Sequence, residues 1–517
     1  MTIRGRALPS GAILVAISLV GLMAVGARVL QLFHYQQYFA STYGLDMMPD
    51  RLSEGYHRWL LMVSTIRSGF VYSDFKPMPN LAVVWPPLYQ YASSILMAAS
   101  GSRSIWIPRA VSFLSGVLAC LIVSAICYRI YGSPWKAFVG GSVLAVQPWH
   151  MDYSVLTSME VLLGLLLCLA IWALMANRIA PFSVLLALMM MTSYTGWALS
   201  AILTSLAYAR RGWRPREASI PLASMASAFA TWCGWSYANA GSPFAWFSAY
   251  LALIGWRPSF DPAILLFYPN LSLVMTFFVF FIGILFGSVK GGWARFAVAT
   301  SVLFLVAISI AHSVALDPGG IERIVPLMPL MALSVPSALP DFKGRAAKRA
   351  AMGLALALIL LVPLSTQALI GPKKAYIIMP EYRTSLELRK RYGGGTVLCD
   401  SPLVIYYSGI DPSAFVSFDS LASHGAMRDP QSTANWLRSN GVAYLIWQNA
   451  SFSRSWILLP DLGMAGEHWI GDARLVVAYE DSIRSYYGPA PGRGNHTQWE
   501  HAYPGVHDLV MYRVELP

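Results

Sequence analysis

The residues best suited to chemistry gather in one polar stretch, residues 45–76, directly after the first membrane-length apolar run. Asp46, Asp50 and Glu54 precede His57 within little more than three helical turns. A carboxylate so placed can act as the general base that takes a proton from an attacking hydroxyl. Composition alone is equally compatible with a solvated loop that carries a surface helix.

From Leu52 onward the stretch has the pattern of an amphipathic helix. Its apolar positions recur near i, i+3, i+4 and i+7, which is typical of one buried helix face. These apolar residues are Leu52, Tyr56, Trp59, Leu60, Val63 and Ile66. Asp50, Glu54, His57 and Arg58 lie on or beside the opposite face. We expect this helix to lie flat on a bilayer, with its acids above any cavity that opens beneath it.

A second candidate acid lies in the loop 147–160, which contains His150, Asp152 and Glu160. Glu160 is expected to begin a helix, where the helix dipole stabilises a carboxylate. Glu54 and Glu160 could share a divalent ion, with Asp152 as a third oxygen donor, or one acid could be the base while the other holds a cation. The sequence alone does not bring the two loops together, and it leaves the metal requirement open.

A cationic candidate, Arg323, lies at the outer end of a predicted helix, just after the tight turn that Gly319 and Gly320 allow. An arginine at the headgroup level can bind a lipid phosphate through two parallel hydrogen bonds. Ordinary contact with lipid headgroups is the alternative. Arg257 and Lys76 are weaker candidates of the same kind.

Composition identifies the class of protein that must position these groups. The chain has 517 residues, of which 56% are hydrophobic and only 12% charged, with a mean hydropathy of +0.52. These values predict a polytopic α-helical membrane protein. The net charge of +12 comes from short basic clusters between apolar runs, so it reflects membrane topology rather than nucleic-acid binding. The five cysteines form no disulfide or zinc pattern.

The basic clusters also predict sidedness. Arg4 and Arg6 place the N-terminus in the cytoplasm, and we expect about eleven transmembrane helices in a plasma-membrane protein. If Leu81–Ala99 spanned the membrane, every later loop would change side. We expect it to be an outer-surface helix instead, broken near its start by two prolines. Two short helices that meet at Ser193–Trp197 would leave a polar pocket facing outward.

The chain composition changes at Gly371, so we expect a membrane domain of residues 1–370 and an extracytoplasmic α/β domain of residues 371–517. The latter is predicted to contain a helix over Pro380–Tyr392 and a second one with Asp429 as N-cap, Pro430 at its first position and Gly441 at its end. Six predicted strands are Thr396–Cys399, Val404–Tyr407, Ala414–Phe418, Val442–Trp447, Leu475–Tyr479 and Leu509–Val514.

Arg109 with the span that follows it, and five further blocks taken in order, resemble motifs of the GT-C superfamily of integral-membrane glycosyltransferases. This superfamily includes protein O-mannosyltransferases, bacterial lipid A aminoarabinose transferases and oligosaccharyltransferase catalytic subunits. The blocks are Glu54-Gly-Tyr-His57, Trp85-Pro86-Pro87-Leu88-Tyr89, Ser158-Met-Glu160, Tyr194-Thr-Gly-Trp197 and Glu322-Arg323-Ile-Val-Pro-Leu-Met-Pro. The sequence departs from the family where Ser53 precedes Glu54 and where Ile324 follows Arg323.

The resemblance implies a GT-C-like inverting glycosyltransferase that transfers a hexose or pentose from a polyprenyl-phosphate donor on the outer face of the membrane. Its acceptor would be a lipid, a glycan or a protein. Glu54 or Asp50 would be the base, with Glu160 as the second acid. The candidate substrate-binding residues are Arg323, His57, Lys76, Tyr194, Trp197 and Arg257.

Two other classes of protein remain open from sequence. A lipid or polymer transporter with an outer accessory domain would keep ionisable groups at mid-membrane, whereas here they collect mostly in the outer loops. A non-catalytic membrane scaffold is the third option. The sequence does not specify the sugar, the acceptor or the oligomeric state.

Overall fold

The computed structural model describes most of the chain, with gaps between the described segments. These segments are residues 11–43, 53–72, 85–253, 262–275, 292–314, 321–339, 379–423, 429–448, 467–481 and 509–517, with a few single positions between them.

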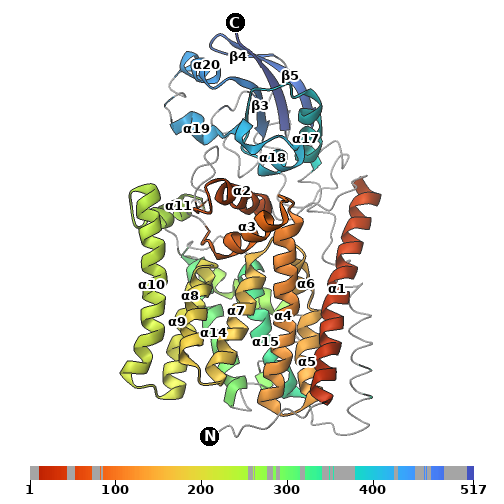
Figure 1. Ribbon diagram of the computed structural model, residues 1–517, viewed down its shortest axis with the longest axis vertical. Coiled ribbons are helices and arrows are strands. Elements are labelled where there is room, and N and C mark those ends of the chain that lie inside the picture. The colour runs from red at the N-terminus through yellow and green to blue at the C-terminus, as the bar shows by residue number, and fades with distance from the viewer. Residues whose placement is uncertain are drawn as a thin grey trace. The chain divides into compact units, whose positions relative to one another are not determined.

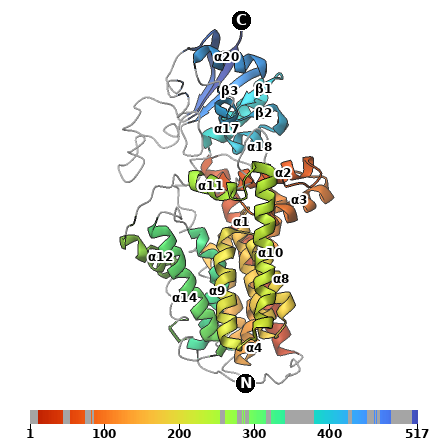
Figure 2. The same cartoon turned by 90° about the vertical axis from the view of Figure 1, so that its left-hand side faces the viewer.

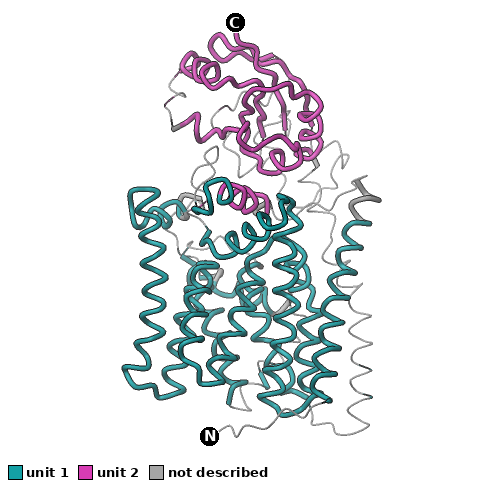
Figure 3. The backbone as a smooth tube through the Cα atoms, in the orientation of Figure 1, with its two compact units in different colours: residues 1–48, 65–72, 83–370 teal, residues 49–64, 73–82, 371–517 magenta. Residues whose placement is uncertain are grey.

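The chain divides into two compact units, coloured separately in Figure 3. Unit 1 comprises residues 1–48, 65–72 and 83–370, and unit 2 comprises residues 49–64, 73–82 and 371–517. The polar stretch after the first helix is therefore split: positions 50 and 54 belong to the same unit as the C-terminal domain, whereas position 46 belongs to unit 1. We describe each unit by itself.

Unit 1 is helical, and its longer helices run alongside one another in both views (Figures 1 and 2). Its first helices are α1 (Ala12–Tyr43), α3 (Leu88–Ser100), α4 (Trp106–Tyr131), α5 (Pro134–Ala145), α6 (Pro148–Ser154), α7 (Met159–Met175) and α8 (Ile179–Met190). They are followed by α9 (Tyr194–Arg211), α10 (Pro215–Ala240), α11 (Ala245–Leu253), α12 (Phe267–Met275), α14 (Gly292–Ser313) and α15 (Met328–Ser334). The 3₁₀ helices η1 (Pro262–Leu266), η2 (Ile321–Arg323), η3 (Val325–Leu327) and η4 (Val335–Ala338) complete it.

Among the described residues, three helices are long and apolar enough to cross a membrane, namely α1 over Ala12–Gln37, α4 and α14. A fourth span is possible if α6 and α7, which meet at a bend of 112°, are counted together. These helices make the protein a membrane protein. The expected number of about eleven spans is not confirmed.

The prolines and glycines of the sequence explain where the unit 1 helices begin and end. Pro86 and Pro87 precede α3, which has 13 residues and is too short to span. The expected pair of short helices is confirmed, because α8 ends at Met190 and α9 begins at Tyr194. Further along, three prolines divide the apolar helical stretch Val325–Ala338 into η3, α15 and η4.

Unit 2 contains α2 (Ser53–Arg67) as far as residue 64, together with a six-stranded sheet and its helices. The strands are β1 (Thr396–Leu398), β2 (Phe415–Val416), β3 (Val442–Gln448), β4 (His468–Ile470), β5 (Ala473–Asp481) and β6 (Leu509–Glu515). Their order is β2-β1-β3-β6-β5-β4. β1 is parallel to both of its neighbours, whereas the other three pairs are antiparallel. The sheet is therefore mixed.

Helices cover both faces of this sheet (Figure 1). On one face, Leu445 and Trp447 of β3 share a core with Leu437 of α20 (Pro430–Ser439). Because alternate side chains of a strand point to opposite faces, Tyr444 points the other way, and its hydroxyl donates to the Arg391 carbonyl at the end of α17 (Met379–Arg391) at 2.6 Å. The expected helices α17 and α20 are confirmed.

The helix α20 begins as predicted, with Asp429 at the N-cap and Pro430 in the first turn. One predicted strand, Val404–Tyr407, is wrong, because these residues lie in the helix α18 (Pro402–Ser408). The Ser401 hydroxyl caps that helix by accepting from the Val404 amide at 3.2 Å. Ser401-Pro402 therefore begins α18 in the same way as Asp429-Pro430 begins α20: a side-chain oxygen caps the helix and a proline follows in the first turn. The short strand β4 was not predicted.

Candidate functional site

The helix that carries the first-loop candidates is α2, and it is more buried than an amphipathic surface helix would be. Residues 55–65 are all buried, including those of its polar face: His57 is 9% exposed and Arg58 only 1%. The helix itself was predicted correctly. That it lies flat on a bilayer stays a prediction. A buried helix holds its side chains more firmly than a surface helix does.

Rings from unit 2 account for much of this burial. Trp59 packs edge-on against Tyr406 with 4.9 Å between ring centroids, and the Tyr56 ring lies 5.4 Å from Tyr406 and 5.7 Å from Tyr407. The hydroxyls of Tyr56 and Tyr407 are 2.7 Å apart and hydrogen-bonded. The direction of α2 within unit 2 therefore depends on residues of α18.

Several candidates lie outside the described residues. These are Asp46, Asp50, Lys76 and Arg257, together with the side chain of Glu54. Their proposed roles stay predictions.

The second candidate acid, Glu160, lies in the first turn of α7 and is 4% exposed. The Ser158 hydroxyl donates to its Oε2 atom at 2.8 Å. Ser112 of α4 holds the backbone of Ser158 at both polar groups, donating to its carbonyl at 2.9 Å and accepting from its amide at 3.1 Å. The bend between α6 and α7 is thus fixed from α4.

Tyr89, from the Pro-Pro-Leu-Tyr block, completes this anchor. Its hydroxyl lies 2.9 Å from the Ser112 hydroxyl and donates to the Pro108 carbonyl at 2.8 Å. The preceding residue, Leu88, donates its amide to the Met191 carbonyl at 2.9 Å, at the break between α8 and α9. This block therefore links the turn before Glu160 to the turn before Tyr194, which the sequence could not show.

Asp152 belongs to a separate polar network between α1 and α6. The Tyr35 hydroxyl donates to its Oδ1 atom. Arg28 lies about two helical turns before Tyr35 on α1, and His150 lies two residues before Asp152 on α6. The guanidinium of Arg28 lies 2.9 Å from Nδ1 of His150 and donates to the Ala24 carbonyl at 2.9 Å. Nδ1 must accept this hydrogen bond, because an arginine has only donors. His150 is therefore neutral in this contact.

Arg28 is a residue that sequence reasoning missed. It lies within the apolar span of α1 and is completely buried. A lone arginine inside an apolar run is costly, which is the signal that could have revealed it. Gly116 of α4 makes room here, since a Cβ atom on it would lie 2.2 Å from the Ser154 hydroxyl and 3.2 Å from Nε of Arg28.

Arg323 ends η2 and is half-buried, and the residues that follow it are packed into unit 1. η3 packs on α7, and a Cβ atom on Gly164 would lie 3.6 Å from Pro326. Gly164 is one helical turn after Glu160. Arg323 therefore leads into an element that contacts the same helix as the second acid.

Tyr194 and Trp197 belong to an aromatic group at the start of α9. Tyr194 stacks on Trp246 of α11 at 5.1 Å, and Trp197 lies 5.1 Å from the same indole. Nε1 of Trp197 donates to the Met190 carbonyl at 2.8 Å, which closes the break between α8 and α9. Trp197 thus has a structural contact in addition to its proposed role in substrate binding.

No group of three or more histidine, cysteine, aspartate or glutamate side chains that could hold a metal occurs among the described residues. Asp152 and Glu160, the two described members of the suggested metal set, accept from Tyr35 and Ser158 respectively. All five cysteines are free and buried.

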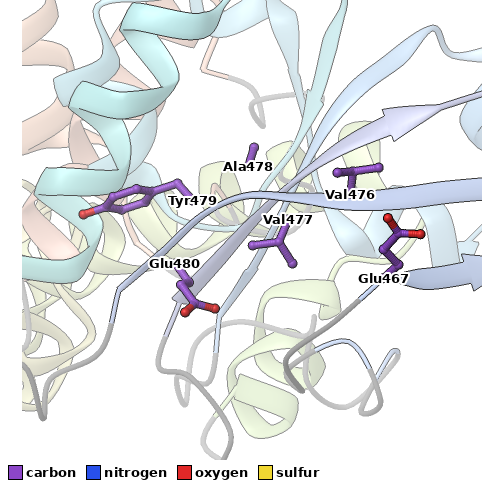
Figure 4. Close-up of a pocket in the computed structure, with 6 residues that line it drawn as sticks. All are labelled: Glu467, Val476, Val477, Ala478, Tyr479 and Glu480. Carbon is purple, nitrogen blue, oxygen red and sulfur yellow. The ribbon is translucent and has the colours of Figure 1, made fainter.

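A surface hollow on unit 2 lies at the bulge of β5. Figure 4 shows its lining residues, Glu467, Val476, Val477, Ala478, Tyr479 and Glu480. Glu467 is paired with Arg474 at 2.6 Å. The hollow contains none of the residues predicted to act in catalysis.

The fold is similar to that of solved structures over most of the chain. The crystal structure of ArnT from Cupriavidus metallidurans bound to undecaprenyl phosphate covers 90% of this chain and 93% of its own, with a TM-score of 0.56 at 12% sequence identity. ArnT is a GT-C glycosyltransferase. The chain has the GT-C fold. The fold that the resemblance implied is confirmed.

Two further GT-C structures are similar. The apo form of the same ArnT covers 90% of this chain and 93% of its own, with a TM-score of 0.55 and 12% identity. An oligosaccharyltransferase from Archaeoglobus fulgidus covers 83% of this chain and 67% of its own, with a TM-score of 0.49 and 14% identity. No protein-family model matches the chain, and no curated protein is similar to it in sequence.

Proposed function

We propose that this protein is an inverting glycosyltransferase, which takes a pentose or hexose from a polyprenyl-phosphate carrier and passes it to a lipid, glycan or protein acceptor on the outer face of the plasma membrane. The observation that carries the proposal is the GT-C fold shared along 90% of the chain with ArnT, whose crystal structure contains undecaprenyl phosphate. The N-terminus would be cytoplasmic and the sheet domain, residues 371–517, extracytoplasmic.

The chemistry requires few groups, since a sugar on a lipid phosphate already carries a good leaving group. Glu54, or Asp50 in its place, would take the proton of the acceptor hydroxyl as that oxygen attacks the anomeric carbon. The bond from that carbon to the phosphate oxygen breaks in the same step, so the configuration at the anomeric carbon inverts.

The departing phosphate needs a cation. Arg323 would hold it by charge-assisted hydrogen bonds, with Lys76 and Arg257 as further cationic candidates. His57 would contact substrate one helical turn after Glu54, and Tyr194 and Trp197 would line the route from the bilayer. Glu160, fixed by Ser158, would be the second acid.

The direct test uses the purified full-length chain with a panel of undecaprenyl-phosphate-linked pentoses and hexoses and a membrane-lipid extract as the source of acceptor. We expect release of undecaprenyl phosphate from one member of the panel. The matched control is Glu54→Gln, which preserves side-chain shape and removes the charge. Folded wild-type protein that releases lipid phosphate from no donor would contradict the proposal.

One observation favours the transporter alternative, namely the charge of Arg28 within an apolar span. In vesicles, a transporter would move the lipid-linked sugar between leaflets and leave the bond to phosphate intact. We place Arg28 instead in a helix junction, because its hydrogen bonds run to the Ala24 carbonyl and to His150.

A further inference from the structure

The C-terminal domain and the helix α2 share one aromatic cluster. Its members are Tyr56 and Trp59 of α2, Tyr406 and Tyr407 of α18, and Tyr382 of α17. Each ring lies between 4.9 and 5.7 Å from another ring of the cluster, mostly edge-on or tilted. Such geometry is the favourable one for aromatic pairs and adds to the effect of burial.

One hydrogen bond within this cluster joins parts of the sequence that are 351 positions apart, between the hydroxyls of Tyr56 and Tyr407 at 2.7 Å. Tyr56 is completely buried and Tyr407 is 7% exposed. A buried hydroxyl that loses its partner costs more than the bond itself contributes. The pair therefore fixes the two helices to each other at one defined point.

Tyr407 is in turn held rigidly to the sheet. Ser401, which caps α18, donates to Glu381 of α17 at 2.6 Å, and Gln448 at the end of β3 donates to the same Oε1 atom at 2.8 Å. These contacts connect the central strand, α17 and α18. Figures 1 and 2 show α17 and α18 together beside the sheet. Tyr407 therefore fixes the position of Tyr56 relative to the sheet.

The rotation of α2 about its axis follows from where Tyr56 is fixed. At ~100° per residue, position 54 lies roughly 200° from position 56, on nearly the opposite side of the helix, whereas position 59 lies on the same side as position 56. Trp59 does pack in the cluster, as this geometry requires. The cluster thus sets the direction that position 54 faces.

We propose that Tyr407 is a positioning residue for the glycosyl transfer: its hydroxyl, through Tyr56, holds α2, which carries the proposed base Glu54, in one rotation about its axis. This inference rests on the proposed function. It makes the sheet domain part of the catalytic apparatus rather than an accessory to it.

The test compares single hydroxyl deletions in the full-length protein. Tyr407→Phe keeps the ring and removes one O–H group, and it should lower kcat about three- to tenfold without changing the KM for the donor. Turnover is divided by the amount of protein that binds undecaprenyl phosphate, so that unfolded protein does not lower the measured kcat. Tyr56→Phe should have the same effect, and the double variant should lose no more than either single one.

The matched control is Tyr444→Phe, which removes the hydroxyl of another buried tyrosine and its part-buried bond to the Arg391 carbonyl, in the same unit but outside the aromatic cluster. We expect it to leave kcat per donor site unchanged. If Tyr444→Phe and Tyr407→Phe lower kcat equally, or if the losses in the double variant multiply, the positioning role is overturned. If wild-type protein turns over no donor, the proposed function fails and this inference with it, whereas normal turnover by Tyr407→Phe overturns the inference alone.

Discussion

The two regions that carry the candidate acids are held in place by different forces. In unit 1, the bend before Glu160 and the neighbouring α6 are fixed by buried hydrogen bonds, from Ser112 to Ser158 and from Tyr35 to Asp152. In unit 2, α2 is fixed by ring packing and by the bond between Tyr56 and Tyr407. The bend in unit 1 thus relies on directional bonds, whereas α2 combines such a bond with ring packing.

This difference suggests a division of roles. The bend in unit 1 has the character of a rigid frame, whereas α2 depends on a domain that is separate in sequence. The following predictions test that division, from the largest expected effect to the smallest.

Glu54→Gln should reduce turnover by roughly 10²–10⁴-fold, because a positioned general base contributes about that much. Binding of undecaprenyl phosphate should persist, since Glu54 is not the residue proposed to hold phosphate. Turnover and lipid binding are measured side by side for Glu54→Gln, Asp50→Asn and Asp46→Asn. If Asp50→Asn is inactive and Glu54→Gln is active, the base is Asp50, about one helical turn before Glu54.

Arg323→Ala should weaken donor use by on the order of 10²-fold, if the guanidinium forms a charge-assisted and partly desolvated contact with phosphate. Arg323→Lys should recover only part of this loss, because an ammonium cannot form the two parallel hydrogen bonds. The measurement is kcat/KM for the donor. Wild-type values in both variants would leave Arg323 as a headgroup contact only.

Gly116→Ala should disrupt the frame in unit 1. Its new methyl group would collide with Ser154 and press on Arg28, so we expect a loss of about 1–3 kcal/mol in unfolding free energy. Gly26→Ala in α1 is the matched control, because no atom lies within 4 Å of the added carbon. Thermal unfolding in detergent compares the two. If Gly116→Ala and Gly26→Ala are equally stable, the junction of α1, α4 and α6 can move enough to accommodate the methyl group, and the prediction is wrong.

Glu381→Gln should change how stability depends on pH. Burial raises the pKa of the Glu381 carboxyl above its usual value of 4.5, although Ser401 and Gln448 partly oppose this. The folded state therefore keeps this proton to a higher pH than the unfolded state does. The contribution to stability is fully present below 4.5 and is lost as pH rises to the raised pKa.

The amide variant lacks that dependence, so its stability relative to wild type should increase as pH rises through this window. Unfolding midpoints measured from pH 4 upward provide the comparison. A constant difference between the two proteins at every pH would contradict the raised pKa.

Local signals in the sequence predicted the elements well. An Asp-Pro pair began α20, the pair Pro86-Pro87 preceded α3, and the apolar periodicity after Leu52 produced α2. The same kind of signal was missed at Ser401-Pro402, where an apolar, tyrosine-rich run was taken for a strand. In the structure the N-cap outweighs the strand preference of those residues, as tertiary context often allows.

What the sequence determined by itself is the class of protein, the existence of α2, the order of the motif blocks and most strands of the C-terminal sheet. These follow from composition and from interactions between near neighbours. Only the tertiary structure decided that α2 joins the C-terminal domain, that Tyr89 anchors the bend before Glu160 and that Arg28 meets His150. Such contacts join tyrosines, serines and single charges far apart in the chain, and nothing local distinguishes a tyrosine that will pair from one that will not. Their partners are selected when the helices pack, because a buried hydroxyl or guanidinium must then find a hydrogen bond.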